Sequence, residues 1–274
     1  MIDGAREPAA AWSWDDLDGA ARLWATLAGV GLQAGSTHSR YLFKLDLAWV
    51  NLIGCRFTQM DLSSSRLSGA HLEHADLRKV NLEETALDGA VLYHANLSWV
   101  EARGADLRGA VCEGADFTEA VLAEARCDGA DCKRAIANRA ELTGASFERA
   151  RLLDAVLESV DLENGKLRGA HVTGAALTLA NLRGCDLREA VLKRCDLRGA
   201  DLAGALLDGA LLEGARFSAR GTDDSGKSIG SALSERQAAP LPSKAQLLSA
   251  KWQSIEIDGA EWTREKLQAS DGNF

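Results

Sequence analysis

Three groups of residues in this chain could do chemistry: a phosphate-loop pattern, six cysteines and five histidines. The pattern G-x-x-x-x-G-K-[ST] spans residues 221–228. Such a loop wraps backbone N–H groups around a phosphate, between a buried strand and the start of a helix. Only 46 residues follow Ser228, too few for a nucleotide-binding sheet, and Asp223 and Asp224 would repel phosphates. We therefore expect neither a bound nucleotide nor another cofactor.

Histidine and cysteine side chains are common metal ligands. The sequence contains no C-x-x-C pair, which argues against a zinc site. His71, His74 and His94 fall on one side of a five-residue repeat and could hold a metal, but we identify no carboxylate that supports them. No Ser–His–Asp set and no pair of carboxylates in a cleft stands out. The sequence therefore predicts no metal site, no catalytic residue and no enzyme activity.

A repeat of five residues determines which elements position these side chains. Every fifth residue from Leu42 to Phe217 is apolar, which makes 36 consecutive units, and 26 of these centres are Leu. The residue two before the centre is Ala in 23 units, and the residue two after it is Gly in 15 units. A period of five fits neither a helix, with 3.6 residues per turn, nor a strand, with a period of two. It is typical of a solenoid.

A chain that turns by roughly 90° every five residues closes a square coil of about 20 residues with one centre on each side. Coils stacked at the strand spacing of about 4.8 Å bury their backbone bonds in parallel ladders. The small residue points to the narrow axis, and Gly provides the positive φ of a type II turn. All six cysteines then point inward, and Cys112 stacks on Cys132. We expect reduced thiols, with a disulfide between these two as the alternative.

Stretches such as ADLRGA at 105–110 and CDLRGADLAGA at 195–205 match the consensus A-(D/N)-L-x-x. The chain therefore resembles the pentapeptide-repeat family. The resemblance implies an all-β fold, a right-handed quadrilateral parallel β-helix of about nine coils. In part it is a resemblance to the quinolone-resistance group, whose members protect bacterial DNA gyrase by imitating duplex DNA. The family is diverse, so the resemblance indicates the fold much more strongly than the function.

The repeat divides the chain into four parts. We expect an N-terminal helical cap at 1–39, the β-helix at 40–219, a polar loop at 220–249, and degraded repeats with a short helix at 250–274.

Both flanks carry signals of capping elements. Residues 13–29 have the pattern of an amphipathic helix that covers the first coil, with dimerisation as the alternative. The C-terminal part places Trp252, Ile257 and Trp262 at centre-like positions, and a short helix is expected from Thr263. Solenoids need such caps because each end exposes an unpaired ladder.

The formal net charge of −9 argues against direct nucleic-acid binding and leaves room for a basic protein partner. Sorted by side of the square coil, the charge is uneven. The side centred on Leu42, Leu62 and Leu82, here called the acidic side, has nine acids and three bases, whereas the other sides total −1, 0 and +1. The acids are Asp61, Glu83, Glu84, Glu101, Glu124, Glu141, Asp161, Glu163 and Asp201.

A second surface is defined by aliphatic residues in outward positions. It lies on the side centred on Leu52, Leu72 and Leu92, which also carries the histidines and is here called the apolar side. Its outward apolar residues are Ile53, Val91, Tyr93, Val111, Leu153, Val191 and Leu211.

These two surfaces predict a non-catalytic interaction rod with protein partners, as a monomer or a homodimer. A DNA-mimicking binder of gyrase or another topoisomerase, which protects it from topoisomerase poisons, is the first alternative, and an adaptor of a secretion system or effector is the second. The N-terminus lacks the pattern of a signal peptide, and no run of about 18 apolar residues occurs, so we expect a cytoplasmic bacterial protein that does not bind membranes.

Overall fold

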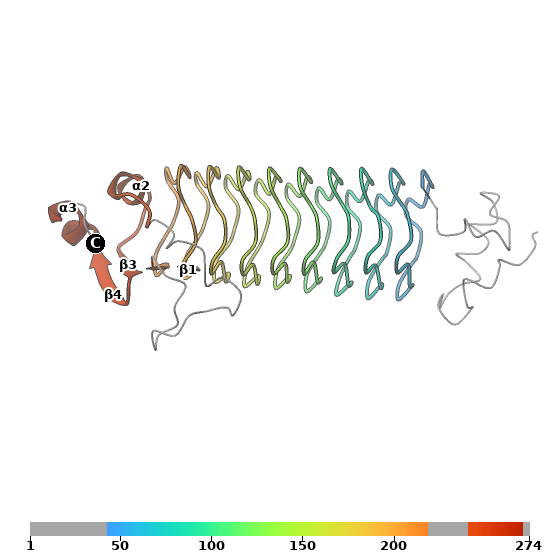
Figure 1. The fold of residues 1–274 in the computed structure, drawn as a ribbon, viewed down its shortest axis with the longest axis horizontal. Helices are drawn as coiled ribbons and strands as arrows, with labels where there is room; N and C mark the ends of the chain where they lie inside the picture. Colours follow the sequence, from blue (N-terminus) through green and yellow to red (C-terminus); the bar gives the residue numbers. More distant parts are fainter. Residues whose placement is uncertain (1–42, 219–240, 271–274) are drawn as a thin grey trace, which may run out of the picture.

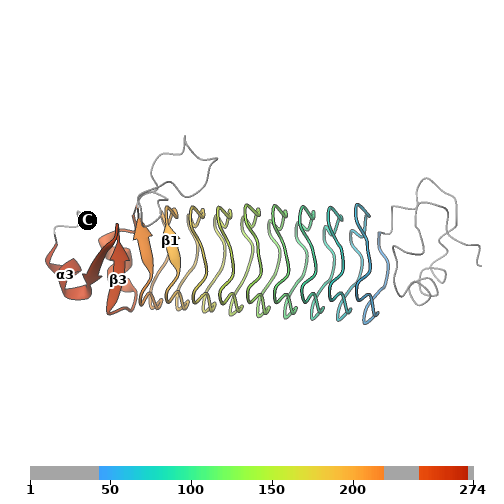
Figure 2. The same cartoon turned by 90° about the horizontal axis from the view of Figure 1, so that it is seen from below.

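The computed structural model describes residues 43–218 and 241–270, which form a row of stacked coils with a small C-terminal unit at one end (Figures 1 and 2). Parallel bridges join residues 20 positions apart, from Asp46↔Arg66 to Val191↔Leu211. The backbone N–H of Leu47 donates to the carbonyl of Arg66, and the N–H of Arg66 donates to the carbonyl of Leu45, both at 2.7 Å. The predicted β-helix solenoid is therefore confirmed, whereas the helix predicted at 13–29 lies outside the described residues.

Each corner of the coil is a turn whose third residue has a positive φ. The N–H of Val50 donates to the carbonyl of Leu47 at 3.3 Å, and Trp49 between them has a φ of 63°. The same conformation recurs at every fifth residue, and many of these residues are not glycine. The sequence prediction that glycine provides the corners was therefore too narrow. The left-handed conformation costs about 1–2 kcal/mol at each corner that is not glycine. Hydrogen bonds between stacked coils offset this cost. For example, the N–H of Trp49 donates to the backbone carbonyl of Ser68 in the next coil at 3.0 Å.

The core is a column of side chains along the axis of the coil. Centres such as Leu47 and Leu72 and small residues such as Ala70 are completely buried. All six cysteines are buried, as the repeat predicts, and none of them forms a disulfide. Burial raises the pKa of the Cys185 thiol to about 12, and a hydrogen bond with Cys132 together with burial raises the pKa of Cys112. These two thiols are therefore protonated and poor nucleophiles at neutral pH.

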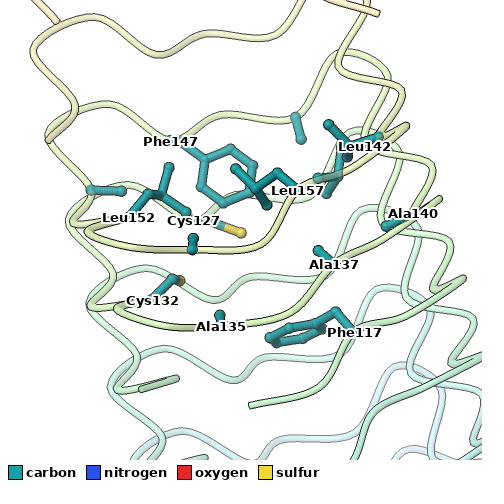
Figure 3. Packing of buried hydrophobic residues seen from close by; sticks show 14 of the residues in the cluster. Phe117, Cys127, Cys132, Ala135, Ala137, Ala140, Leu142, Phe147, Leu152 and Leu157 are labelled. Atoms are coloured by element: carbon teal, nitrogen blue, oxygen red, sulfur yellow. The ribbon is translucent and has the colours of Figure 1, made fainter. Parts of the chain in front are cut away.

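One part of this column is underfilled. The coil with centres Leu122, Cys127, Cys132 and Ala137 has three small centres, and an apolar cavity of about 30 Å³ lies there. Phe117 and Phe147, from the coils on either side, fill part of the missing volume (Figure 3). The walls are apolar side chains, so the cavity is of the kind that stays dry.

Because of the cavity, we expect the same Cys→Val substitution to stabilise the fold at one position and to destabilise it at another. Cys132→Val adds about one methyl group next to free volume, and we expect it to raise the free energy of unfolding by about 0.5–1 kcal/mol. Cys185→Val adds the same group at a small position without free volume, where Sγ of Cys185 donates to the carbonyl of Leu162 at 2.9 Å. It should cost about 1–3 kcal/mol. Urea unfolding of both variants checks this, and equal shifts would contradict the packing described.

The C-terminal unit continues the ladder after an insertion in the sequence. The strands β1 (Asp196–Arg198) and β2 (Arg216–Ser218) pair in parallel, and β2 pairs in parallel with β3 (Ser254–Ile257). Within the second pair, Phe217 lies opposite Ile257, 40 residues later instead of 20. Trp252 and Ile257 are buried, as their predicted centre positions require.

Residues 244–249 differ from the polar loop predicted at 220–249. They form the helix α2 (Lys244–Ser249), whose N-cap Ser243 makes a capping box with Gln246. The Gln246 side chain also donates to the carbonyls of Leu202 and Ala205, at 3.0 and 2.9 Å. The sequence signal of this helix is the S-x-x-Q pattern at 243–246, which is independent of the five-residue period. The helix thus covers backbone acceptors of the last coil.

Trp262 does not occupy a centre of the coil, in contrast to the prediction. The chain reverses at Asp258 and Gly259, whose φ values are 48° and 78°, as in a type I′ hairpin. The strand β4 (Ala260–Thr263) is therefore antiparallel to β3, and Trp262 pairs with Ile255. The Asp-Gly pair is the sequence signal of this reversal.

The two short helices of the C-terminal unit cap each other. The predicted terminal helix is present as α3 (Arg264–Ala269), with Thr263 as its N-cap. Arg264 donates to the carbonyls of Ala250 and Leu248 at the end of α2, at 2.7 and 2.5 Å. Lys244 donates to the carbonyls of Gln268 and Ser270 at the end of α3, at 2.9 and 2.6 Å. Cations at both C-termini complement the helix dipoles and close this end of the solenoid.

Candidate interaction surface

The acidic side carries its charge on five exposed glutamates and four half-buried acids. The exposed ones are Glu83, Glu84, Glu101, Glu124 and Glu141, on four successive coils; the half-buried ones are Asp61, Asp161, Glu163 and Asp201. The repeat places them because outward positions before and after each centre recur once per coil. The structure therefore gathers the nine predicted acids on one side of the rod.

Almost none of this negative charge is neutralised within the described residues. Arg183 pairs with Asp201 at 3.0 Å, and the other eight acids have no ion-pair partner among residues 43–218 and 241–270. Asn181 instead donates to Asp161 at 2.9 Å and to Glu163 at 3.3 Å, which holds two carboxylates near each other without cancelling their charge. The acidic side thus presents a negative field to solvent.

The two neighbouring sides neutralise part of their acids through a local motif. Each Asp-Leu-Arg triplet of the sequence forms an ion pair between its first and third residues. In the triplet at 106–108, Arg108 donates to both carboxylate oxygens of Asp106, through Nε at 2.7 Å and through Nη2 at 2.5 Å. The equivalent pairs are Asp76–Arg78, Asp186–Arg188 and Asp196–Arg198. The contrast between the sides is therefore one of pairing as well as of composition.

In the triplet at 106–108, the arginine lowers the pKa of the aspartate. The pKa of Asp106 lies below its ordinary value of 3.8, chiefly because Arg108 donates hydrogen bonds to the carboxylate. A lowered folded-state pKa stabilises the fold above 3.8, and this contribution is lost as the pH falls through the folded-state value. In urea unfolding at decreasing pH, the wild type should lose stability more steeply than Asp106→Asn. Parallel losses would contradict the role given to this pair.

The apolar side is less continuous than the sequence predicts. Of its seven predicted residues, Ile53, Tyr93 and Val111 are exposed, at 45%, 39% and 37%, and the other four are half-buried. Val91 is bridged to Val111. Further along the same row, Asp131 and Arg151 form an ion pair at 3.3 Å and separate these residues from Val191 and Leu211. The side thus presents separate apolar spots.

His74 and His94 form a surface cluster with Tyr93, and His71 on the same side has a carboxylate neighbour that sequence reasoning missed. Nδ1 of His71 lies 3.1 Å from Oε1 of Glu73, two residues away. The rings of His74 and His94 are stacked with centroids 5.7 Å apart, and Tyr93 meets the His94 ring edge-on at 4.2 Å. Within the described part of the chain, no group of three potential ligands is arranged to hold a metal.

Two exposed tryptophans at corners were also missed as surface features. Trp99, 45% exposed, lies at the corner between the acidic side and the side before it, and its Nε1 donates to Glu119 at 3.0 Å. Trp49, 74% exposed, lies against the backbone of Gly69, so closely that any side chain at Gly69 would collide with its ring. The sequence signal for both exposed tryptophans is a Trp two residues after a centre, which is a corner position. The phosphate-loop pattern at 221–228 lies outside the described residues.

The five-residue repeat and its coil agree with a known family of sequences. A family model of pentapeptide repeats matches eight copies, from residues 42–78 to residues 195–219. The chain belongs to the pentapeptide repeat family. Proteins of this family typically have structural or interaction roles and no catalytic activity. No curated protein matches the chain in sequence.

Solved structures of pentapeptide repeat proteins resemble this one. HetL, a pentapeptide repeat protein involved in heterocyst differentiation regulation in the cyanobacterium Nostoc sp. strain PCC 7120, is 26% identical, with a TM-score of 0.59 over 80% of this chain and 90% of HetL. A trypsin-treated variant of QnrB1, a plasmid-mediated fluoroquinolone resistance protein, is 22% identical, with a TM-score of 0.40 over 61% of this chain and 92% of that protein. Among the described residues of this family member, no helix is long and apolar enough to cross a membrane.

Proposed function

We propose that this pentapeptide repeat protein is a non-catalytic interaction rod whose acidic side binds a basic surface of a protein partner. The observation that carries the proposal is that eight of the nine acids on this side have no ion-pair partner among the described residues, while the triplet pairs neutralise acids on the neighbouring sides. Unpaired carboxylates in rows attract a cationic surface and steer its approach. HetL, a pentapeptide repeat protein with a similar structure, is involved in the regulation of heterocyst differentiation.

Paired variants test this function in a cell extract. The acidic-side triple, Glu83→Gln with Glu84→Gln and Glu101→Gln, removes three exposed unpaired charges. The balanced triple, Glu148→Gln with Glu158→Gln and Asp208→Asn, removes three exposed acids from other sides.

Each triple brings the formal net charge from −9 to −6. The partner should be retained on immobilised full-length wild type and balanced triple, and lost from the acidic-side triple. Equal retention by both triples would contradict the proposal.

A narrower candidate is a DNA-mimicking role toward bacterial gyrase, in the cytoplasm. Acids recur along the rod at the coil spacing of about 4.8 Å, while duplex DNA carries one charge per about 1.7 Å. The acidic side thus resembles duplex DNA in carrying negative charge along its length. Its charges are more widely spaced than the phosphates of DNA.

If this candidate holds, micromolar full-length protein should reduce gyrase supercoiling and relieve quinolone-induced cleavage, and the acidic-side triple should do so less. Unchanged supercoiling and cleavage would exclude gyrase as the partner.

A further inference from the structure

Trp99 is a large exposed side chain at one edge of the acidic side. It occupies the corner that leads into this side, and its indole remains in contact with solvent. Val100 is buried, and the next residue, Glu101, is an exposed acid that has no ion-pair partner among residues 43–218 and 241–270. An aromatic ring and an unpaired carboxylate therefore lie on the two flanks of one corner.

Contacts with later coils hold the indole of Trp99 in place. Its Nε1 donates to Oε2 of Glu119, one coil later, at 3.0 Å. Oε1 of the same carboxylate lies 3.5 Å from Nη1 of Arg139, a further coil along the rod. A side chain that is already ordered loses little conformational freedom on binding, and Trp is frequent among the residues that dominate binding energies. The structure thus prepares Trp99 as an anchor for a partner.

The ring of Trp99 already has a cation beside it within the protein. Nζ of Lys79, one coil earlier, lies 5.6 Å from the ring centroid. Cation–π contacts extend to about 6 Å, so this ammonium group lies near the outer limit of the interaction. A planar guanidinium stacks on an indole more closely, and its fork of N–H donors also matches a carboxylate. The site therefore fits arginine better than lysine.

We propose that Trp99 binds an arginine side chain of the partner, whose guanidinium replaces Lys79 over the ring and pairs with Glu101. This inference rests on the proposed function and specifies the chemistry of the partner, which presents arginine at the edge of its basic surface. The exposed Trp49 has the same position in its repeat unit but lies at a corner that does not border the acidic side. It takes no part in this recognition.

Calorimetric titrations of the full-length protein at low salt, with an arginine peptide and a lysine peptide of equal length, test the proposal. Trp99→Leu should weaken binding of the arginine peptide about fivefold and binding of the lysine peptide less than twofold. Leu fits this corner, because Leu179 occupies the same corner four coils later with a φ of 61°, close to the 57° of Trp99.

Two further variants identify the aromatic ring as the cause. Trp99→Phe removes the Nε1 donor to Glu119 and keeps an aromatic face, so it should retain the preference for the arginine peptide. Trp49→Leu is the matched control at the other exposed tryptophan and should leave the binding of both peptides unchanged.

Equal weakening of both peptides by Trp99→Leu, or no weakening of either, would overturn the proposal. The acidic-side triple, measured in the same titrations, separates these results from a failure of the proposed function. If the triple weakens both peptides, the acidic side binds cations and only the role of Trp99 is excluded. If the triple weakens neither peptide, the proposed function and this inference both fail.

Discussion

Replacing Phe147 with alanine is expected to lower the free energy of unfolding by about 3–5 kcal/mol, the usual range for removing a buried aromatic ring. Phe147 lines the cavity and stands one coil after Cys127, where its ring occupies volume that the small neighbouring centre leaves empty. Its removal enlarges an existing void, and the stacked backbone cannot collapse to fill it. Urea unfolding followed by circular dichroism measures the loss.

The matched substitution is Phe147→Leu, since Leu is the residue at most centres of this repeat. It keeps an apolar side chain that fits the square coil, and we expect a cost below about 1.5 kcal/mol. A loss as large as that of the alanine variant would mean that a specific aromatic contact, and not volume, makes Phe147 important.

The acidic-side triple should weaken binding of a basic partner by about tenfold, and the loss should shrink as salt rises. Exposed charge pairs contribute roughly 0.2–1 kcal/mol each, so three together give about 1.4 kcal/mol, or tenfold. With a polylysine peptide as the probe, the wild type should lose affinity between about 50 and 200 mM salt more steeply than the triple, because screening removes the interaction that the triple already lacks. Equal salt dependence would indicate that the probe binds elsewhere.

Most of the fold could be predicted because the five-residue period encodes it directly. An apolar centre, mostly Leu, and a residue two positions before it, mostly Ala, have one consistent arrangement, which is a narrow coil with both inside. The C-terminal unit was less predictable, since the insertion changes the register from 20 to 40 residues. Local signals determine the structure there. The capping box at Ser243 begins a helix. The Asp258–Gly259 turn reverses the chain, so Trp262 does not reach the centre position that the apparent period predicted.

The composition of the acidic side was also predictable, but its pairing was not. Position in the coil places Glu83 and Glu101 on one side without knowledge of any side-chain contact. Whether an acid is neutralised depends on rotamers and on the next coil. Asp106, for example, pairs with Arg108 in its own unit and with Arg126 one coil later, at 3.5 Å. The sequence alone shows an excess of charge, and the structure shows that this charge is unpaired.

Comparison of the two triples in one titration tests most directly whether the acidic side is the binding surface. The acidic-side triple and the balanced triple change the net charge equally and differ in which side loses it. In calorimetric titrations with the polylysine peptide at low salt, we predict about tenfold weaker binding for the acidic-side triple and a change of less than about twofold for the balanced triple. Equal weakening by both triples would show that the peptide responds to bulk charge and would contradict a located interaction surface.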